Sequence, residues 1–266
     1  MTPGTQSGKW NDLTTRIGSA AVMVIIGSIC IWNGGWPFRG LVAGVAGLMI
    51  WELVRMRAPH RRLSAIAVGA VAALAVWLVP AAGFWGAMAL VLGTTALVGL
   101  VSFPNWKLGA GYALVILLGS IVLIALRSQL GIGWVVWVVS VIIATDIAGY
   151  FAGKTFGGPK FWPRISPKKT WSGTIAGWGG AALVGILFGL GSGMMVQIVL
   201  LSVLLSFAGQ LGDIGESAIK RRSGVKDSSA LIPGHGGVLD RFDALLGASL
   251  VLLVIAWLTG FPGGLT

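Results

Sequence analysis

Long apolar runs separated by short polar segments dominate the sequence. Nine of these runs approach the roughly 20 residues that a helix needs to cross the hydrocarbon core of a bilayer. Pro80 followed by Gly83 supplies a turn that divides the apolar stretch 64–102 into two helices. The pattern predicts an all-α polytopic integral membrane protein of about nine transmembrane helices, at 17–35, 38–54, 64–80, 82–102, 108–126, 131–152, 172–191, 194–213 and 242–261.

Lysines and arginines are distributed unevenly between the connecting segments. When the segments are numbered from zero at the N-terminus, 17 of the 19 basic residues fall in even-numbered segments, and only Arg39 and Arg127 do not. Cytoplasmic loops of membrane proteins carry an excess of Lys and Arg. We therefore expect the N-terminus and the two long polar segments, 153–171 and 214–241, to face the cytoplasm from the inner (plasma) membrane.

Composition excludes an ordinary soluble domain. Hydrophobic residues make up 56% of the chain and charged residues only 10%, with a mean hydropathy of +0.89, whereas soluble domains carry about 25% charged residues. The 13 tryptophans suit two lipid–water interfaces. The 42 glycines suit helices that pack closely in a bilayer. They are compatible with a homodimer but do not require one. Three glycine pairs are spaced to share a helix face: Gly40 with Gly44, Gly149 with Gly153, and Gly173 with Gly177.

The net charge of +11 would suggest nucleic acid in a soluble protein. Here the positive-inside bias and anionic lipid heads account for it, so membrane lipids and no nucleic acid are the expected partners. The lone Cys30 lies in an apolar run, where packing is its expected role. We expect the first apolar run to be retained as a helix. Residues 1–266 then form a single transmembrane domain, with less specific helices at about 1–130 and catalytic helices and loops at about 131–266.

Carboxylates are rare and gather near the C-terminal end, where five of the eight acidic residues fall between 213 and 243. One group shares a face of the eighth span, by helical spacing: Asp213, Glu216, Ser217 and Lys220. A second pair, Asp240 and Asp243, enters the ninth span, where backbone N–H groups are free. Oxygen ligands without His or Cys clusters favour Mg²⁺. Ion pairing with nearby basic residues is the alternative explanation for these carboxylates.

A glycine-rich segment, Pro233-Gly-His-Gly-Gly237, separates the two acidic groups. Glycines let the backbone approach a ligand closely and turn its N–H groups toward an anion. With Lys220, Arg221 and Lys226 before it and Asp240 after it, the segment resembles a cradle for phosphate and metal. His235 is either a phosphate donor or an ordinary loop histidine.

The segment 153–171 contains a second basic cluster, Ser166-Pro-Lys-Lys-Thr-Trp171. Its lysines stand beside hydroxyls and suit phosphate binding, although contact with lipid heads explains them equally. Thr170 or Ser172 is placed to cap the seventh span. Asp146 lies inside the sixth span and requires a partner, either a lysine of this cluster or the metal region.

The stretch from Ser217-Ala-Ile-Lys220-Arg221 through Lys226-Asp227 and Pro233–Gly237 to Asp240-Arg241-Phe-Asp243 resembles phosphatidate cytidylyltransferases, the CDP-diacylglycerol synthases. The match covers about 27 residues. Three further pieces keep the family's order: Asp146 with Tyr150 and Gly153, the run Ser166–Trp171, and Gly212-Asp213. The N-terminal half matches the family only in hydropathy and length.

The resemblance implies Mg²⁺-dependent transfer of CMP from CTP to phosphatidic acid, which gives CDP-diacylglycerol and pyrophosphate. It implies that Asp213 and Asp240 are the principal metal ligands, with Asp243 close by. Catalytic roles are implied for Asp213, Asp240, Lys220, Arg221 and His235. Substrate or phosphate contacts are expected from Ser166, Lys168, Lys169, Thr170, Ser217, Lys226, Gly236, Gly237, Arg241 and Asp146. Ser172 departs from the family, which usually has Glu at this position.

Two other classes stay open. One is a different CTP-dependent lipid phosphotransferase or kinase, or a CDP-alcohol phosphotransferase, although the four-aspartate helical pattern of the last family is not found in this sequence. The other is a transporter. Transporters place charges near the bilayer midplane, whereas the charges here gather on one predicted side.

Overall fold

The computed structural model describes residues 6–261. Nine helices within this range are long and apolar enough to cross a membrane, which confirms the predicted polytopic all-α membrane protein. They are α1 (Gln6–Asn33), α2 (Gly35–Arg57), α3 (Arg62–Leu78), α4 (Gly83–Val101), α5 (Trp106–Ala125), α6 (Ile132–Phe156), α7 (Trp171–Gly189), α8 (Met195–Arg222) and α9 (Leu239–Thr259). The expectation that the N-terminus faces the cytoplasm includes residues 1–5, which lie outside the described range.

Two short helical turns complete spans that the hydropathy pattern predicts. The 3-10 turn η1 (Val79–Ala81) contains Pro80 and makes the expected break before α4. The π-helical turn η2 (Leu126–Leu130) extends α5 to the start of α6.

A small antiparallel hairpin, which the sequence pattern did not predict, lies between α6 and α7. Its strands are β1 (Lys160–Trp162) and β2 (Ser166–Thr170), with Trp162 opposite Ser166 and Lys160 opposite Thr170. The strand Ser166–Thr170 is mostly polar and contains a proline, so it lacks the apolar alternation by which strands are recognised in a sequence. Most of the second basic cluster, Ser166–Thr170, is therefore an ordered strand and not an irregular loop.

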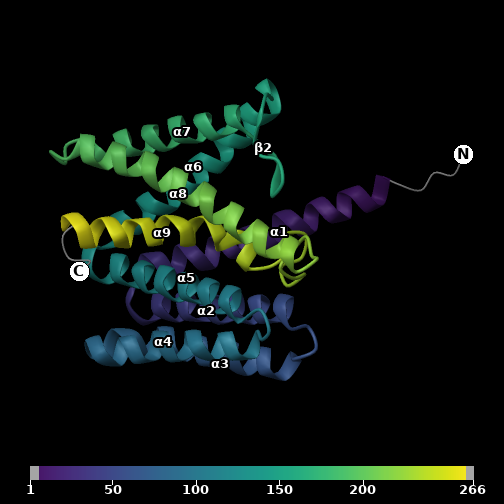
Figure 1. Ribbon diagram of the computed structural model, residues 1–266. Coiled ribbons are helices and arrows are strands. Elements are labelled where there is room, and N and C mark those ends of the chain that lie inside the picture. Colours follow the sequence, from purple (N-terminus) through teal and green to yellow (C-terminus); the bar gives the residue numbers. More distant parts are fainter. Residues whose placement is uncertain (1–5, 262–266) are drawn as a thin grey trace, which may run out of the picture.

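The helices lie side by side in a bundle (Figure 1). Helices α3 and α4 form one flank, and α6, α7 and α8 form the other. Between them, α2 packs on α3 and α5, while α9 packs on α5 and α8. Because α2 also contacts α9, the N-terminal half of the chain reaches the beginning of the last span.

Close packing joins α6 to α7 at two of the predicted glycine pairs. A Cβ added to Gly173 would lie 2.7 Å from the carbonyl oxygen of Gly149, and one added to Gly149 would lie 3.1 Å from that of Gly173. Only residues without side chains allow two helix backbones to approach so closely. Gly44 differs, since nothing lies within 4 Å of an added Cβ there.

Exposed tryptophans lie at both ends of the bundle. Trp106 and Trp171 begin α5 and α7, and four others lie at helix ends remote from the two long polar segments. These four are Trp32 at the end of α1, Trp36 at the start of α2, Trp85 at the start of α4 and Trp257 at the end of α9. Indole rings favour the lipid–water interface because they combine an apolar body with one N–H donor. Such rings at both ends of the bundle suit a protein with two lipid–water interfaces.

Two helices extend beyond their predicted spans at the long polar segment 214–241. Helix α8 continues from Asp213 to Arg222, and α9 begins at Leu239 rather than 242. Most of the acidic and basic residues expected in a loop are consequently helical, and only 223–238 connects the two spans. Asp240 stands in the first turn of α9.

Candidate active site

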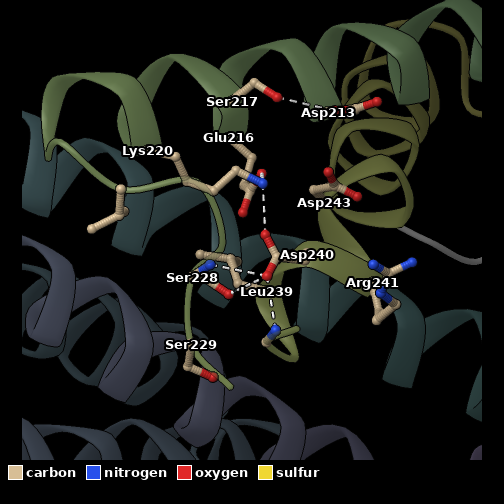
Figure 2. Close-up of polar contacts among 12 residues, drawn as sticks. Asp213, Glu216, Ser217, Lys220, Ser228, Ser229, Leu239, Asp240, Arg241 and Asp243 are labelled. Carbon is tan, nitrogen blue, oxygen red and sulfur yellow. Dashed lines mark hydrogen bonds and ion pairs between the residues drawn. The ribbon is translucent and has the colours of Figure 1, made fainter. Parts of the chain in front are cut away.

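The facing ends of α8 and α9 hold a cluster of carboxylates and lysines (Figure 2). The two helices can approach here because Gly212 and Gly247 lack side chains. A Cβ on Gly212 would meet the carbonyl oxygen of Asp243, and one on Gly247 would meet that of Ala208 at 2.5 Å. This packing brings the predicted acidic groups together: Asp213, Glu216 and Lys220 from α8, and Asp240 and Asp243 from α9.

Asp240 is the most highly connected of these carboxylates. Its Oδ1 lies 2.6 Å from Lys220 Nζ. Its Oδ2 accepts hydrogen bonds from Ser228 N (2.9 Å), Ser228 Oγ (2.8 Å) and Gly237 N (2.8 Å). Lys220 also pairs with Glu216 one turn earlier on α8. The ends of both helices and the glycine-rich segment are thus joined through one buried side chain.

Asp213 lies on α8 about two turns before Lys220 and forms an ion pair with Lys169 of the hairpin. Lys169 Nζ of β2 lies 2.6 Å from Asp213 Oδ2 and donates to the carbonyl oxygen of Gln210 at 3.2 Å. Ser217 Oγ donates to Asp213 Oδ1 at 3.3 Å. Both members of the Lys169–Asp213 pair remain partly exposed, so this pair can exchange partners with a ligand.

The cluster contains more carboxyl groups than ammonium groups. Four carboxylates face two ammonium groups, Lys169 and Lys220. Asp243 is buried beside Asp213. Glu216 is fully buried, and neither of its oxygens has a hydrogen-bond partner among the described residues, although it pairs ionically with Lys220. Buried carboxyl oxygens are the donor type that a hard divalent cation requires.

The carboxylates of the cluster are suitable ligands for such a cation, but they are not arranged around one common point. Among residues 14–261, no three His, Cys, Asp or Glu side chains converge as a ready-made metal centre. Lys169 and Lys220 neutralise the oxygens of Asp213 and Asp240 in this state. A cation at these oxygens would replace an ammonium group as their counter-ion.

A polar cavity of about 490 Å³ lies between α1 and the glycine-rich segment. Three cationic side chains line it, Arg16, Lys226 and Arg241, together with Asp227 and His235. Helix α1 closes one wall, because Ser19 Oγ lies 2.8 Å from His235 Nδ1 and donates to the carbonyl oxygen of Pro233 at 2.9 Å. The cavity is suited to an anionic group.

Three of the predicted substrate-binding residues, and the predicted catalytic residue Arg221, lie outside this cluster. Thr170 is buried and caps α7 by accepting from Gly173 N at 3.2 Å, which confirms the expected helix cap. Ser172 contacts Thr170 and the carbonyl oxygen of Gly157. Ser166 and the exposed Lys168 lie on β2. Arg221 NH1 lies 3.4 Å from the carbonyl oxygen of Val225, and so helps to terminate α8.

Three further predicted residues border the site. Asp146 on α6 lies near enough to Asp213 and Lys169 for their charges to interact. Arg241 donates from Nε and NH2 to the carbonyl oxygen of His235, at 3.1 and 2.7 Å, and so braces the loop. Gly236 has a positive φ of 88° and lies against Asp240 Oδ2, 3.0 Å from where its Cβ would be.

The sequence interpretation assigned no role to Glu52, whose side chain is fully buried on α2. Glu52 accepts hydrogen bonds from Ser229 Oγ and from the backbone at Val238 and Leu239. One signal was present in the sequence, because Glu52 is the single acidic residue between Asp12 and Asp146. Ser228, Ser229, Arg16 and Ser19 were missed because polar residues in loops and at helix ends carry no distinctive pattern.

Comparison with known proteins places this geometry in a family. The profile of the cytidylyltransferase family matches residues 14–259. The chain belongs to this family. It is 34% identical to the phosphatidate cytidylyltransferase of Brucella suis, over 95% of this chain and 96% of the relative. It is 33% identical to that of Pseudomonas aeruginosa, over 94% and 98%, and 32% identical to that of Bacillus subtilis, over 88% and 94%.

The family membership confirms the resemblance found in the motif and the prediction of a nucleotidyltransferase. The match begins at residue 14 and includes α2. The helices that the motif does not cover therefore belong to the family fold as well. Transfer of a nucleotide from a triphosphate generally depends on divalent metal, and the excess of carboxylates in the cluster is consistent with that requirement.

Proposed function

We propose that this integral membrane protein makes CDP-diacylglycerol from CTP and phosphatidic acid at the carboxylate and lysine cluster of α8 and α9. The observation that carries the assignment is the convergence of Asp213, Asp240 and Asp243 with Lys169 and Lys220 at one end of the bundle. We assign that end to the cytoplasmic face of the inner membrane, since the basic segments lie there and CTP is a cytoplasmic nucleotide.

Mg²⁺ is the cation that we assign to the cluster, with Asp213 and Asp240 as principal ligands and Asp243 beside them. When bound, it would offset the negative charge of the triphosphate and of the departing pyrophosphate. Lys169 and Lys220, which neutralise these carboxylates in the structure, then become available to the phosphate oxygens. Asp240 would then release Lys220, and its other oxygen would keep the hydrogen bonds from Ser228 and Gly237.

The triphosphate of CTP is assigned to the polar cavity at the glycine-rich segment. Lys226, His235 and Arg16 line this cavity, and Gly236 and Gly237 lie at its border with Asp240. Cations on two elements can hold two successive phosphates and direct the α-phosphorus toward the cluster. We retain Arg221, Ser166 and Lys168 as outer contacts with anionic groups, whereas Thr170 and Ser217 position Lys169 and Asp213.

Phosphatidic acid is assigned to a second cavity, of about 410 Å³, between α2 and the same loop. Arg55 provides a cation there, and Trp51, Met56 and Leu231 provide apolar walls. Such a lining suits a lipid head whose phosphate is anionic and whose tails stay in the bilayer. Ser229 and Ala230 line both cavities, so the two substrates would meet across this loop.

The reaction is an in-line displacement. A phosphate oxygen of phosphatidic acid forms a bond to the α-phosphorus of CTP, while the bond from that phosphorus to the bridging oxygen of the β-phosphate breaks and pyrophosphate leaves. No general base is needed, because the lipid phosphate is already ionised near neutral pH. Positioning and charge compensation by the lysines provide the rate.

Two labels on CTP test the proposal. Protein purified in detergent is supplied with Mg²⁺ and phosphatidic acid, and CTP carries the label on its α- or its γ-phosphate. Labelled lipid from the α-label, with labelled pyrophosphate from the γ-label, supports the proposal. Labelled lipid from the γ-label would identify a lipid kinase, and no labelled lipid from either form would reject CMP transfer.

A further inference from the structure

Glu52 connects the less specific half of the chain to the candidate site. Its carboxylate is fully buried near the end of α2, and its contacts all come from residues 228–239. Oε1 accepts from Ser229 Oγ at 2.6 Å and from Val238 N at 2.8 Å, and Oε2 accepts from Leu239 N at 2.7 Å. A buried carboxylate that accepts from these donors is fixed in position by them.

Two of these donors are the first backbone N–H groups of α9. The N-cap residue of α9 is Val238, whose side chain has no oxygen with which to cap the helix. Helix N-termini attract anions because their N–H groups are unpaired and the helix dipole is positive there. Glu52 therefore caps α9 from another helix, and this fixes where the last span begins.

Asp240 depends on the same part of the loop. Ser228 Oγ lies 2.8 Å from Asp240 Oδ2 and 3.3 Å from Glu52 Oε2. Gly237 N donates to Asp240, while a Cβ on Gly237 would lie 2.6 Å from Glu52 Oε1. Ser228 and Gly237 thus stand directly between the two carboxylates.

We infer that Glu52 is a positioning residue, which holds the segment 228–239 so that Asp240 presents Oδ1, the oxygen that pairs with Lys220, to the metal and nucleotide. Glu52 itself touches the loop and not the substrates. The inference rests on the proposed function, because it gives Glu52 its role through Asp240. Groups that orient metal ligands from a second layer typically contribute about 10–100-fold in metal affinity or activity.

Glu52→Gln tests this role because it keeps the shape of the side chain and removes its charge. Two quantities are measured on full-length protein in detergent: the affinity for Mn²⁺, by electron paramagnetic resonance, and kcat with phosphatidic acid and CTP. We expect both to fall about 10–100-fold in the folded variant, with partial recovery in Glu52→Asp, which restores the charge. Ser249→Ala removes a buried hydroxyl from α9 away from the loop and should match the wild type.

The outcomes separate three cases. Folded Glu52→Gln with wild-type Mn²⁺ affinity and kcat overturns the positioning role, because a cap that serves stability alone leaves both values unchanged in the folded protein. If Glu52→Gln does not fold, Ser229→Ala decides, since it removes one donor to Glu52. We expect it to weaken Mn²⁺ binding by about 3–10-fold, and unchanged binding overturns the role. A wild-type protein without CMP transfer rejects the proposed function instead.

Discussion

Lys220 Nζ lies 2.6 Å from Asp240 Oδ1, and this ion pair joins the end of α8 to the first turn of α9. Lys220 is largely buried and also pairs with the fully buried Glu216. Residues that are separated by the whole loop 223–238 thereby share one charge network. Without substrates, these ion pairs hold the ends of α8 and α9 together. Their members can exchange partners when anions and a cation bind.

Replacing Lys220 should destabilise the protein. Lys220→Met keeps most of the aliphatic chain but leaves Glu216 and Asp240 without their counter-charge. Breaking a buried pair from one side costs about 3–5 kcal/mol. Thermal unfolding in detergent should show a clearly lower midpoint than in Lys160→Met, a matched change at an exposed lysine of β1. Equal midpoints would show that the pair does not stabilise the junction of α8 and α9.

Lys169 and Lys168 should differ, although they are neighbours on β2. Lys169 binds Asp213 at 2.6 Å, whereas Lys168 is exposed. Lys169→Gln should lower kcat/KM by about 100–1,000-fold, the scale expected when a group that meets developing charge is lost. Lys168→Gln should raise KM moderately while kcat changes little, and Lys160→Gln is the control. Steady-state kinetics with each substrate varied would contradict the assignment if Lys168 mattered more than Lys169.

Arg55 should affect one substrate and not the other. The proposed lipid cavity is lined by Arg55 and the proposed nucleotide cavity is not. Arg55→Gln should raise KM for phosphatidic acid about 10–100-fold, as expected for a hydrogen bond to a charged group, and leave KM for CTP unchanged. Arg62→Gln, an exposed change at the start of α3, is the control. A rise in the KM for CTP alone would contradict this assignment, because it would place CTP in the cavity that Arg55 lines.

Gly237 should tolerate no side chain. A Cβ there would collide with Ser228 Oγ and lie 2.6 Å from Glu52 Oε1, so the loop would have to move away from Asp240. Gly237→Ala should therefore reduce CMP transfer by more than about 10-fold, on the scale of lost ligand positioning. Gly44→Ala adds the same methyl to a helix where nothing lies within 4 Å, and its activity should equal that of the wild type.

Hydropathy alone predicted the nine spans, because the length of a membrane-crossing helix is dictated by the bilayer. It placed the end of α8 too early, since Asp213, Glu216 and Lys220 are polar but satisfy one another along the helix and across to α9. The motif predicted the carboxylates that meet at the site. Whether they bind metal remains a prediction that the geometry supports.

Glu52 shows what the sequence could not reveal. Its hydrogen-bond partners lie 176 to 187 positions away along the chain. Nothing near Glu52 in the sequence indicates that α2 packs against the loop before α9. The hairpin of β1 and β2 was missed for a different reason, because it consists of polar residues held mainly by their backbone pairing and by contact with α7.

The central claim is that carboxylates of α8 and α9 bind the divalent ion that serves CMP transfer. The most direct test is Mn²⁺ binding to the purified protein, in wild type and in Asp213→Asn and Asp240→Asn, with Ser249→Ala as control. We predict that each Asp variant remains folded and weakens binding by more than about 100-fold, since a ligand should contribute more than the groups that orient it. Wild-type Mn²⁺ affinity in folded Asp213→Asn and Asp240→Asn would contradict the claim.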